Sequence, residues 1–127
     1  MGTRSILLVD DESGIRKILK IFFEMEGYKV FEAVNANQAF ETLEKHAIDL
    51  TILDVILFGI TGFEVCERIK NDIKTKHIYV IIFTALTQDH DLEEGKRVGA
   101  DLYLTKPLNP RDIVRKVNKI FKENLKK

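Results

Sequence analysis

The sequence predicts one α/β domain built on five parallel strands, with helices packed on both faces of the sheet. Five short segments rich in apolar and β-branched residues begin about 21 to 28 residues apart, which is the repeat of a strand–helix unit in a parallel sheet. Segments with helical periodicity separate them. The chain of 127 residues suits one domain and leaves no room for a second. The order 2-1-3-4-5 is one of two common strand orders for such a sheet.

The expected strands are Ile6–Val9, Lys29–Ala33, Leu50–Leu53, Ile78–Phe83 and Asp101–Leu104. The first and fourth of these segments do not alternate between apolar and polar residues. Strands that are buried on both faces have this pattern, because helices cover both sides of the sheet.

Helical patterns fill the intervals between the strands. The first interval has apolar residues at the i, i+3, i+4, i+7 spacing of one buried face, namely Ile15, Ile18, Leu19 and Phe22. Gly27 follows where a left-handed residue would end that helix. The other helices are expected around Ala36–Leu43, at Gly62–Asn71 and Asp89–Val98, and from Pro110 onward after an Asn109 N-cap.

The composition excludes several classes of function. Twenty basic residues balance twenty acidic ones, so the domain has no electrostatic reason to bind nucleic acid or an anionic membrane. No apolar run approaches the ~18 residues that a membrane span needs, and Met1–Ser5 does not resemble a signal peptide. Cys66 is the only cysteine, which favours a reducing compartment and a place in the core on the third helix. We therefore expect a soluble, cytoplasmic domain.

Polar side chains follow four of the five expected strands. These are Asp10 and Asp11 after the first strand, Asp54 after the third, Thr84 after the fourth and Lys106 after the fifth. In the order 2-1-3-4-5 these four strands are contiguous, and functional crevices lie outside the carboxyl ends of parallel strands. The polar residues should therefore converge on one patch.

Three carboxylates at one patch are unstable without a cation. Two unit charges ~5 Å apart repel by roughly 3 kcal/mol at an effective dielectric constant of 20. Mg²⁺ is the hard divalent cation that oxygen ligands favour while leaving waters for a phosphate group. Together with the charge of Lys106 and the hydroxyl of Thr84, this set suits in-line phosphoryl transfer to an aspartate.

The motifs in this order resemble the receiver domain of two-component response regulators over essentially the whole chain, 1–127. They are Leu7-Leu8-Val9-Asp10-Asp11-Glu12, Leu53-Asp54-Val55, Gly62-Phe63-Glu64, Phe83-Thr84-Ala85 and Gly99-Ala100-Asp101-Leu102-Tyr103-Leu104-Thr105-Lys106-Pro107. The resemblance implies the flavodoxin-like receiver fold and a chemotaxis-receiver-like signalling domain. Such a domain assists only its own phosphorylation and dephosphorylation, so it is not a metabolic enzyme.

The resemblance also assigns the phosphoryl acceptor and the metal ligands. Asp54 would accept the phosphoryl group, and Asp11 and Asp54 would bind Mg²⁺ directly. Asp10 would act mainly through water, and the backbone carbonyl of Ile56 would complete the protein ligands. The donor would be a sensor histidine kinase or a histidine phosphotransfer protein.

Further residues would carry the switch. Lys106 would pair with the phosphoryl group, across a cis bond to Pro107, and Thr84 would turn inward toward the phosphate. Tyr103 would change from an exposed to a buried rotamer. The resemblance leaves the output partner or effector domain undefined, and it allows a phosphorylation-dependent homodimer.

The loop after the acceptor departs from the family pattern. Phe58 stands where the family usually has proline, and the segment Val55–Ile60 is apolar for a loop over an active site. We favour the interpretation that these side chains tuck under the loop; the alternative is a contact surface for a partner. Ile56 and Leu86 flank the path of attacking water in this family and cannot orient water, so we hypothesise slow hydrolysis of the phosphorylated form.

Two alternatives compete with a phosphorylatable receiver. A haloacid-dehalogenase-like phosphatase also uses Mg²⁺ and an aspartate nucleophile, but it requires a second acid where this chain has Ile56. A degenerate receiver serving only as an interaction module would lack the acceptor, an acid or the lysine, and none is missing. The sequence favours the phosphorylatable receiver.

Overall fold

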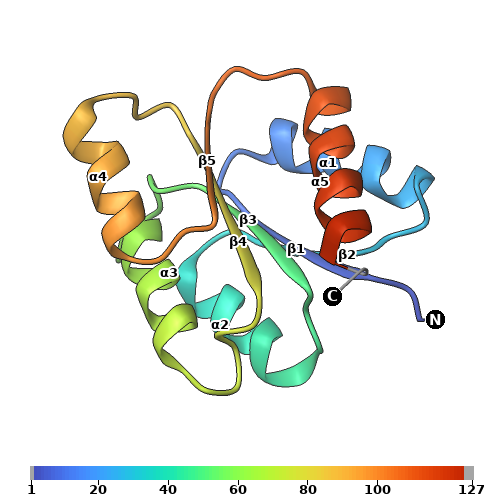
Figure 1. Cartoon of the computed structure of the whole chain (residues 1–127), viewed down its shortest axis with the longest axis horizontal. Coiled ribbons are helices and arrows are strands. Elements are labelled where there is room, and N and C mark those ends of the chain that lie inside the picture. Colours follow the sequence, from blue (N-terminus) through green and yellow to red (C-terminus); the bar gives the residue numbers. More distant parts are fainter. Residues whose placement is uncertain (1, 125–127) are drawn as a thin grey trace.

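Five parallel strands form one sheet in the order β2-β1-β3-β4-β5 in the computed structural model, which describes residues 2–124 (Figure 1). The strands are β1 (Ser5–Val9), β2 (Lys29–Ala33), β3 (Leu50–Leu53), β4 (Tyr79–Thr84) and β5 (Leu102–Thr105). The helices are α1 (Ser13–Met25), α2 (Ala36–Lys45), α3 (Gly62–Asn71), α4 (Asp89–Arg97) and α5 (Pro110–Asn124). The predicted α/β fold and strand order are confirmed.

The predicted element bounds agree with the structure to within one or two residues. β2, β3 and α3 match their predicted ranges, whereas β4 and β5 each begin and end one residue later than predicted. The shift at β4 has a local cause: the N–H of Ile78 donates to the carbonyl of Thr75 in the preceding turn, at 2.9 Å. Ile78 is therefore buried in the core, but its backbone is not yet part of the ladder.

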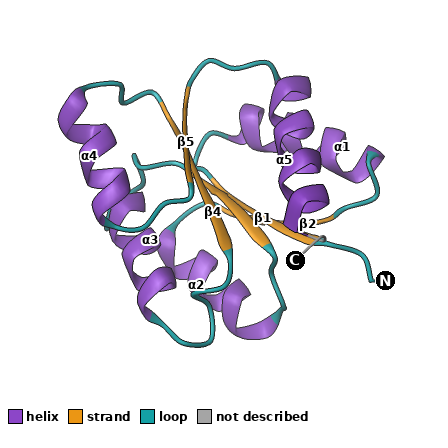
Figure 2. Cartoon of the chain, viewed as in Figure 1, coloured by secondary structure: helices purple, strands orange, loops and turns teal. Residues whose placement is uncertain are grey.

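The helices cover the two faces of the sheet unequally. α1 and α5 lie on one face, and α2, α3 and α4 lie on the other (Figure 2). β1 serves both layers, because Ile6 and Leu8 pack toward α1 and α5 while Leu7 and Val9 pack toward α2 and α3. All four of these side chains are fully buried. This two-sided burial explains why β1 lacks an alternating pattern.

Side-chain caps fix most helix starts. Asn109 Oδ1 accepts a hydrogen bond from the N–H of Arg111 at 2.9 Å, which confirms it as the N-cap of α5. Asn35 and Thr61 cap α2 and α3 in the same manner. α1 is different, because its N-cap residue Glu12 makes no side-chain capping bond. Gly27 follows α1 with a φ of 94°, as predicted.

The predicted place of the single cysteine is confirmed. Cys66 is buried on α3, and this burial raises the pKa of its thiol to about 12. His46, His77 and His90 are exposed. None of the helices in residues 2–124 combines the length and the apolar character that crossing a bilayer requires.

Candidate functional site

The carboxyl ends of four adjacent strands bring the predicted polar residues together. Asp10 follows β1, Asp54 follows β3, Thr84 ends β4 and Lys106 follows β5. The ammonium of Lys106 lies 2.8 Å from Asp10 Oδ2 and 2.9 Å from Asp54 Oδ2. Residues separated by as many as 96 positions in the sequence are therefore in direct contact.

Lys106 holds three carboxylates, because it also lies 3.1 Å from Glu12 Oε1. Its side chain is only 10% exposed. Burial opposes the charged amine, but the hydrogen bonds that Lys106 donates to Asp10 and Asp54 outweigh it and raise the pKa of Lys106. The bond between Lys106 and Pro107 is cis, as predicted.

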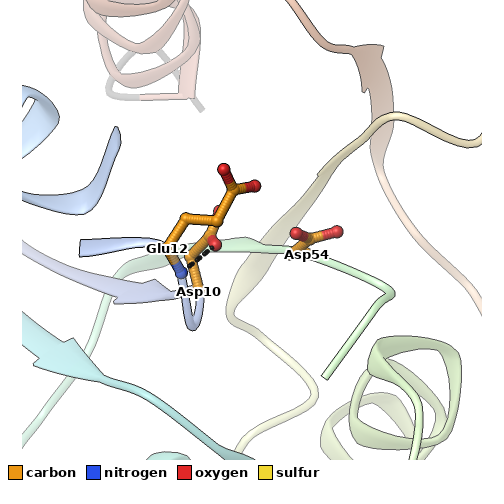
Figure 3. A group of neighbouring side chains, drawn as sticks. All are labelled: Asp10, Glu12 and Asp54. Carbon is orange, nitrogen blue, oxygen red and sulfur yellow. Dashed lines mark hydrogen bonds between the residues drawn. The ribbon is translucent and has the colours of Figure 1, made fainter. Parts of the chain in front are cut away.

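Asp10, Glu12 and Asp54 form an acidic cluster in which one carboxylate oxygen from each lies within 4.8 Å of the others. Figure 3 shows the three side chains directed toward a shared space. Asp10 and Asp54 are buried, whereas Glu12 is largely exposed. Burial raises the pKa of Asp10, although the hydrogen bond from Lys106 acts in the opposite direction. Carboxylate oxygens in this arrangement are the donor set that a hard divalent cation such as Mg²⁺ prefers.

The structure distributes the three adjacent acids differently from the sequence-based expectation. Asp11 is exposed and is not a member of the acidic cluster. Glu12 is a member, although the sequence pattern gave it no role beyond its place in a motif. Its spacing was the available signal: it lies two residues after Asp10, just beyond a strand end. A direct bond from Asp11 to a metal stays a prediction.

Hydrogen bonds with backbone groups hold the two buried aspartates, Asp10 and Asp54, in position. Asp54 donates its N–H to the carbonyl of Val9 at 2.9 Å, which extends the β1–β3 pairing by one residue. Its Oδ1 accepts the N–H of Ile56 at 3.2 Å. Asp10 Oδ1 accepts the N–H of Glu12 at 2.9 Å, drawn as the dashed line in Figure 3. The other oxygen of each aspartate is thereby left for Lys106 or a cation.

Thr84 is fully buried, and within residues 2–124 no group forms a hydrogen bond to its hydroxyl. An unpaired buried hydroxyl costs about 1–3 kcal/mol. The backbone carbonyl of Thr84 accepts a hydrogen bond from the N–H of Lys106 at 2.8 Å. The residue with the unpaired hydroxyl is therefore bonded directly to the backbone of the site lysine.

Tyr103 is half-buried and points its hydroxyl toward the β4–α4 loop, where it donates to the carbonyl of Leu86 at 2.9 Å. Burial is the main cause that raises the pKa of Tyr103 to about 12, and the charges of Asp91 and Asp54 add to it. The ring lies against Gly95 in α4, where a Cβ would come within 2.8 Å of Tyr103 Cδ2. Gly95 thus makes room for this rotamer.

Replacing Gly95 with alanine is expected to turn the Tyr103 ring outward and lower the pKa of its hydroxyl from about 12 toward ~10. The pKa of Tyr103 is higher in the folded parent chain than in the unfolded chain. The contribution of this group to the free energy of unfolding is therefore full below about pH 10, and it is lost as the pH rises from about 10 to about 12. Phenolate absorbance titrations, compared with Tyr103→Phe in each background, isolate this group. An unchanged midpoint would contradict the close packing.

The loop after Asp54 exposes two of its apolar side chains. Ile56 is 54% exposed and Phe58 is 90% exposed, so the favoured interpretation that the loop tucks its side chains inward is wrong for these residues. Leu57 and Ile60 do pack against the core cluster beneath α3. The loop is therefore anchored by Val55, Leu57 and Ile60, and it presents Ile56 and Phe58 to solvent.

A family model described as "Response regulator receiver domain" matches residues 6–118, which include every site residue above. The chain belongs to this family. Receiver domains are signalling domains of two-component systems, so the expected class is confirmed and the phosphatase alternative is set aside.

Several characterised regulators are similar to this receiver domain. The phosphate regulon transcriptional regulatory protein PhoB of Pseudomonas aeruginosa is 38% identical over 122 residues, which cover 96% of this chain and 53% of that protein. The regulatory protein VanR of Enterococcus faecium is 37% identical over 113 residues, covering 88% of this chain and 47% of that protein. The chain spans about half the length of these relatives.

Solved receiver structures share the whole fold. A CheY-like response regulator receiver domain protein from Methanospirillum hungatei superposes with a TM-score of 0.91 at 29% identity, and 98% of each chain is covered. This agreement extends from β1 to α5.

Proposed function

We propose that this receiver domain is a phosphorylation-dependent switch in which Asp54 accepts a phosphoryl group from a histidine of a sensor kinase or phosphotransfer protein. The observation that carries the proposal is the contact of Lys106 with Asp54 at 2.9 Å in a buried pocket. A lysine beside a carboxylate is suited to neutralise a phosphoryl group arriving at that carboxylate. The cytoplasm, where such kinases present their phosphohistidines, is the proposed location.

The residues present fit a bound Mg²⁺. We propose that Asp54 and Asp11 bind it directly, that Asp10 acts through water and that the carbonyl of Ile56 contributes. The acidic cluster places Glu12 to contribute as well. The cation, when bound, supplies charge neutralisation for the phosphoryl oxygens. The buried hydroxyl of Thr84, which has no partner within residues 2–124, supports the proposal because it is a donor that a phosphoryl oxygen could use.

The chemistry of the chain's own residues follows from their positions. An oxygen of Asp54 attacks phosphorus; the new O–P bond forms as the N–P bond of the phosphohistidine breaks, and the imidazole nitrogen keeps the electron pair. Lys106 then exchanges its contact with the free Asp54 oxygen for one with the phosphoryl group. Thr84 donates its hydroxyl to a phosphoryl oxygen, which satisfies the group that is unpaired in the resting state.

The Thr84 contact is the clear net gain, because Lys106 exchanges a bond that it already has. A hydrogen bond to a charged group contributes ~1.5–3 kcal/mol. One such bond shifts a two-state equilibrium by roughly 10- to 150-fold, which is a large part of the ~5.5 kcal/mol that moves a 1:99 equilibrium to 99:1. Movement of Thr84 toward the phosphate would draw the β4–α4 loop with it, and this loop contains the Leu86 carbonyl that Tyr103 contacts. We propose that Tyr103 moves together with the β4–α4 loop and so alters the surface of the domain. An output partner or a second copy of the domain would bind this altered surface.

The test is intact-mass measurement after incubation with acetyl phosphate. We expect one phosphoryl adduct that requires Mg²⁺, disappears with a chelator and is absent in Asp54→Ala. Circular dichroism of Asp54→Ala establishes that the variant is folded. No adduct on the folded wild-type domain in the presence of Mg²⁺ would overturn the proposal in favour of an interaction module.

The lifetime of the phosphoryl group gives a separate prediction. Ile56 and Leu86 are aliphatic, so neither can hold an attacking water near Asp54. Replacing Ile56 with asparagine and Leu86 with glutamate is expected to speed dephosphorylation about tenfold, less than the roughly 10²- to 10⁴-fold of a fully positioned acid–base group, because the new side chains would only orient the water. Loss of the adduct is followed by mass after removal of acetyl phosphate. The double variant Ile56→Val with Leu86→Met serves as the control. Equal dephosphorylation rates in the two double variants would contradict the hypothesis that Ile56 and Leu86 slow hydrolysis.

A further inference from the structure

Arg16 is a buried cation outside the polar patch. It lies in the first turns of α1 and is only 9% exposed. Its Nη1 donates to the backbone carbonyl of Asp10 at 2.7 Å, and its Nε donates to Glu32 Oε1 at 2.9 Å. The guanidinium therefore connects the start of the β1–α1 loop to the edge strand β2. Burying such a group is costly unless its donors are used, so these bonds define its position.

The β1–α1 loop depends on this connection. α1 begins at Ser13 without a side-chain cap, so the means that fixes most helix starts is missing here. Asp10 is instead held on both sides of its backbone: its N–H donates to the carbonyl of Ala33 at 3.1 Å and its carbonyl accepts from Arg16. Both anchors trace to consecutive residues of β2, Glu32 and Ala33. β2, which no residue of the polar patch follows, thus supports the site.

The hydrogen bonds that hold the Asp10 backbone also affect the acidic cluster, through one further bond. Asp10 Oδ1 accepts a hydrogen bond from the N–H of Glu12 at 2.9 Å. The position of Asp10 therefore also determines the position of the Glu12 backbone. Two of the three carboxylates of the cluster lie on this loop. A turn of the Asp10 carbonyl away from Arg16 would move both relative to Asp54.

We propose that Arg16 is a positioning residue for the cation site: its guanidinium, braced by Glu32, holds the β1–α1 loop so that the carboxylates of Asp10 and Glu12 converge with Asp54. The inference rests on the proposed function in that the cation is Mg²⁺. A planar guanidinium donates in two fixed directions, whereas lysine offers a single ammonium on a flexible stem. Glu32 also pairs with Lys20 at 3.4 Å, which keeps the brace in place.

The experiment measures Mg²⁺ binding to the unphosphorylated domain by isothermal titration calorimetry. Arg16→Met is expected to weaken Mg²⁺ binding about tenfold or more, the usual cost of removing an outer partner of a metal site. Arg16→Lys should fall between this variant and the wild type. Glu32→Gln keeps an acceptor for Arg16 and should bind Mg²⁺ more tightly than Arg16→Met does.

A second readout separates positioning from general damage. For Arg16→Met, the rate of phosphorylation by acetyl phosphate should need more Mg²⁺ but reach a plateau close to that of the wild type. Phe23→Leu is the control, since it loosens the core at the other end of α1 and is fully buried there; it should unfold at lower urea with an unchanged Mg²⁺ affinity. Wild-type Mg²⁺ affinity in Arg16→Met would overturn the inference while leaving the proposed function intact. A wild-type domain that neither binds Mg²⁺ nor accepts a phosphoryl group would overturn both.

Discussion

Replacing Lys106 with methionine is expected to slow phosphorylation by acetyl phosphate by about 10- to 100-fold while tightening Mg²⁺ binding. The loss of rate follows from removing a charge-assisted contact of ~1.5–3 kcal/mol to the incoming phosphoryl group. Methionine retains most of the length and apolar contact of the lysine stem. The change therefore removes the charge and the donor with little change of packing.

Mg²⁺ binding should tighten because Lys106 occupies the oxygens that a cation needs. Its ammonium lies 2.8 Å from Asp10 and 2.9 Å from Asp54. Without it, the negative charge of the acidic cluster is uncompensated, so a divalent cation that binds there relieves more repulsion. A loss of rate together with a gain in affinity cannot come from a merely damaged site.

Lys70→Met is the matched control for this prediction. Lys70 is also a partly buried lysine in an ion pair, 2.7 Å from Asp101, but it lies at the opposite end of the strands from the acidic cluster. Its replacement should cost stability and leave both the phosphorylation rate and the Mg²⁺ affinity close to the parent values. Weaker Mg²⁺ binding in Lys106→Met would contradict the view that the lysine and the cation compete.

The convergence of the polar patch could be predicted from the sequence because it depends only on strand order. Once Asp10, Asp54, Thr84 and Lys106 are placed after four strands, the parallel sheet brings them to one edge whatever the helices do. The lengths of the strands did not matter to this inference. A shift of one residue in β4 and β5 leaves Thr84 and Lys106 at the same edge.

The choice among the three adjacent acids could not be predicted in the same way. Which of Asp11 and Glu12 joins the acidic cluster depends on how the β1–α1 loop turns, and that turn is held by Arg16 and Glu32. Glu32 lies on a different strand, sixteen residues from Arg16. No local spacing in the sequence encodes such a contact.

The exposure of Ile56 and Phe58 was missed for a related reason. Apolar side chains in a loop are ordinarily expected to pack inward, and Leu57 and Ile60 do so. Which apolar side chains face outward depends on the course of the loop, whose two ends are fixed by Asp54 and by the start of α3. Gly62 provides that second fixed point: its N–H donates to the carbonyl of Val55 at 2.9 Å.

Gly62 also makes the closest backbone approach to the acceptor, which leads to the second large expected effect. A Cβ on Gly62 would lie 2.8 Å from both the carbonyl carbon of Asp54 and the Cα of Val55, and closer still to the Asp54 carbonyl oxygen. These are backbone atoms and cannot turn aside as a side chain would. Gly62→Ala is therefore expected to destabilise the domain by about 2–3 kcal/mol, the upper part of the range for overpacking.

Urea denaturation of Gly62→Ala measures this loss, and Gly14→Ala is the matched control. Gly14 lies in α1 with nothing within 4 Å of its Cβ position, so alanine there should be neutral or stabilise the domain by up to about 1 kcal/mol. If Gly62→Ala unfolds at the same urea concentration as the parent, α3 can move away from Asp54 without cost, and the close packing is not a constraint.

The position of the strain also predicts how activity should change in Gly62→Ala. Separation of α3 from β3 must displace either Asp54 or the start of the helix, and Asp54 is the better anchored of the two by its bond to Val9. If α3 is the element that moves, phosphorylation should fall only a few-fold while stability falls sharply. If Asp54 moves, the phosphorylation rate should fall by about 100-fold, because a small displacement of a reacting atom is sufficient for such a loss. We expect the first outcome, since the β1–β3 pairing holds the acceptor more firmly than the exposed loop holds the helix.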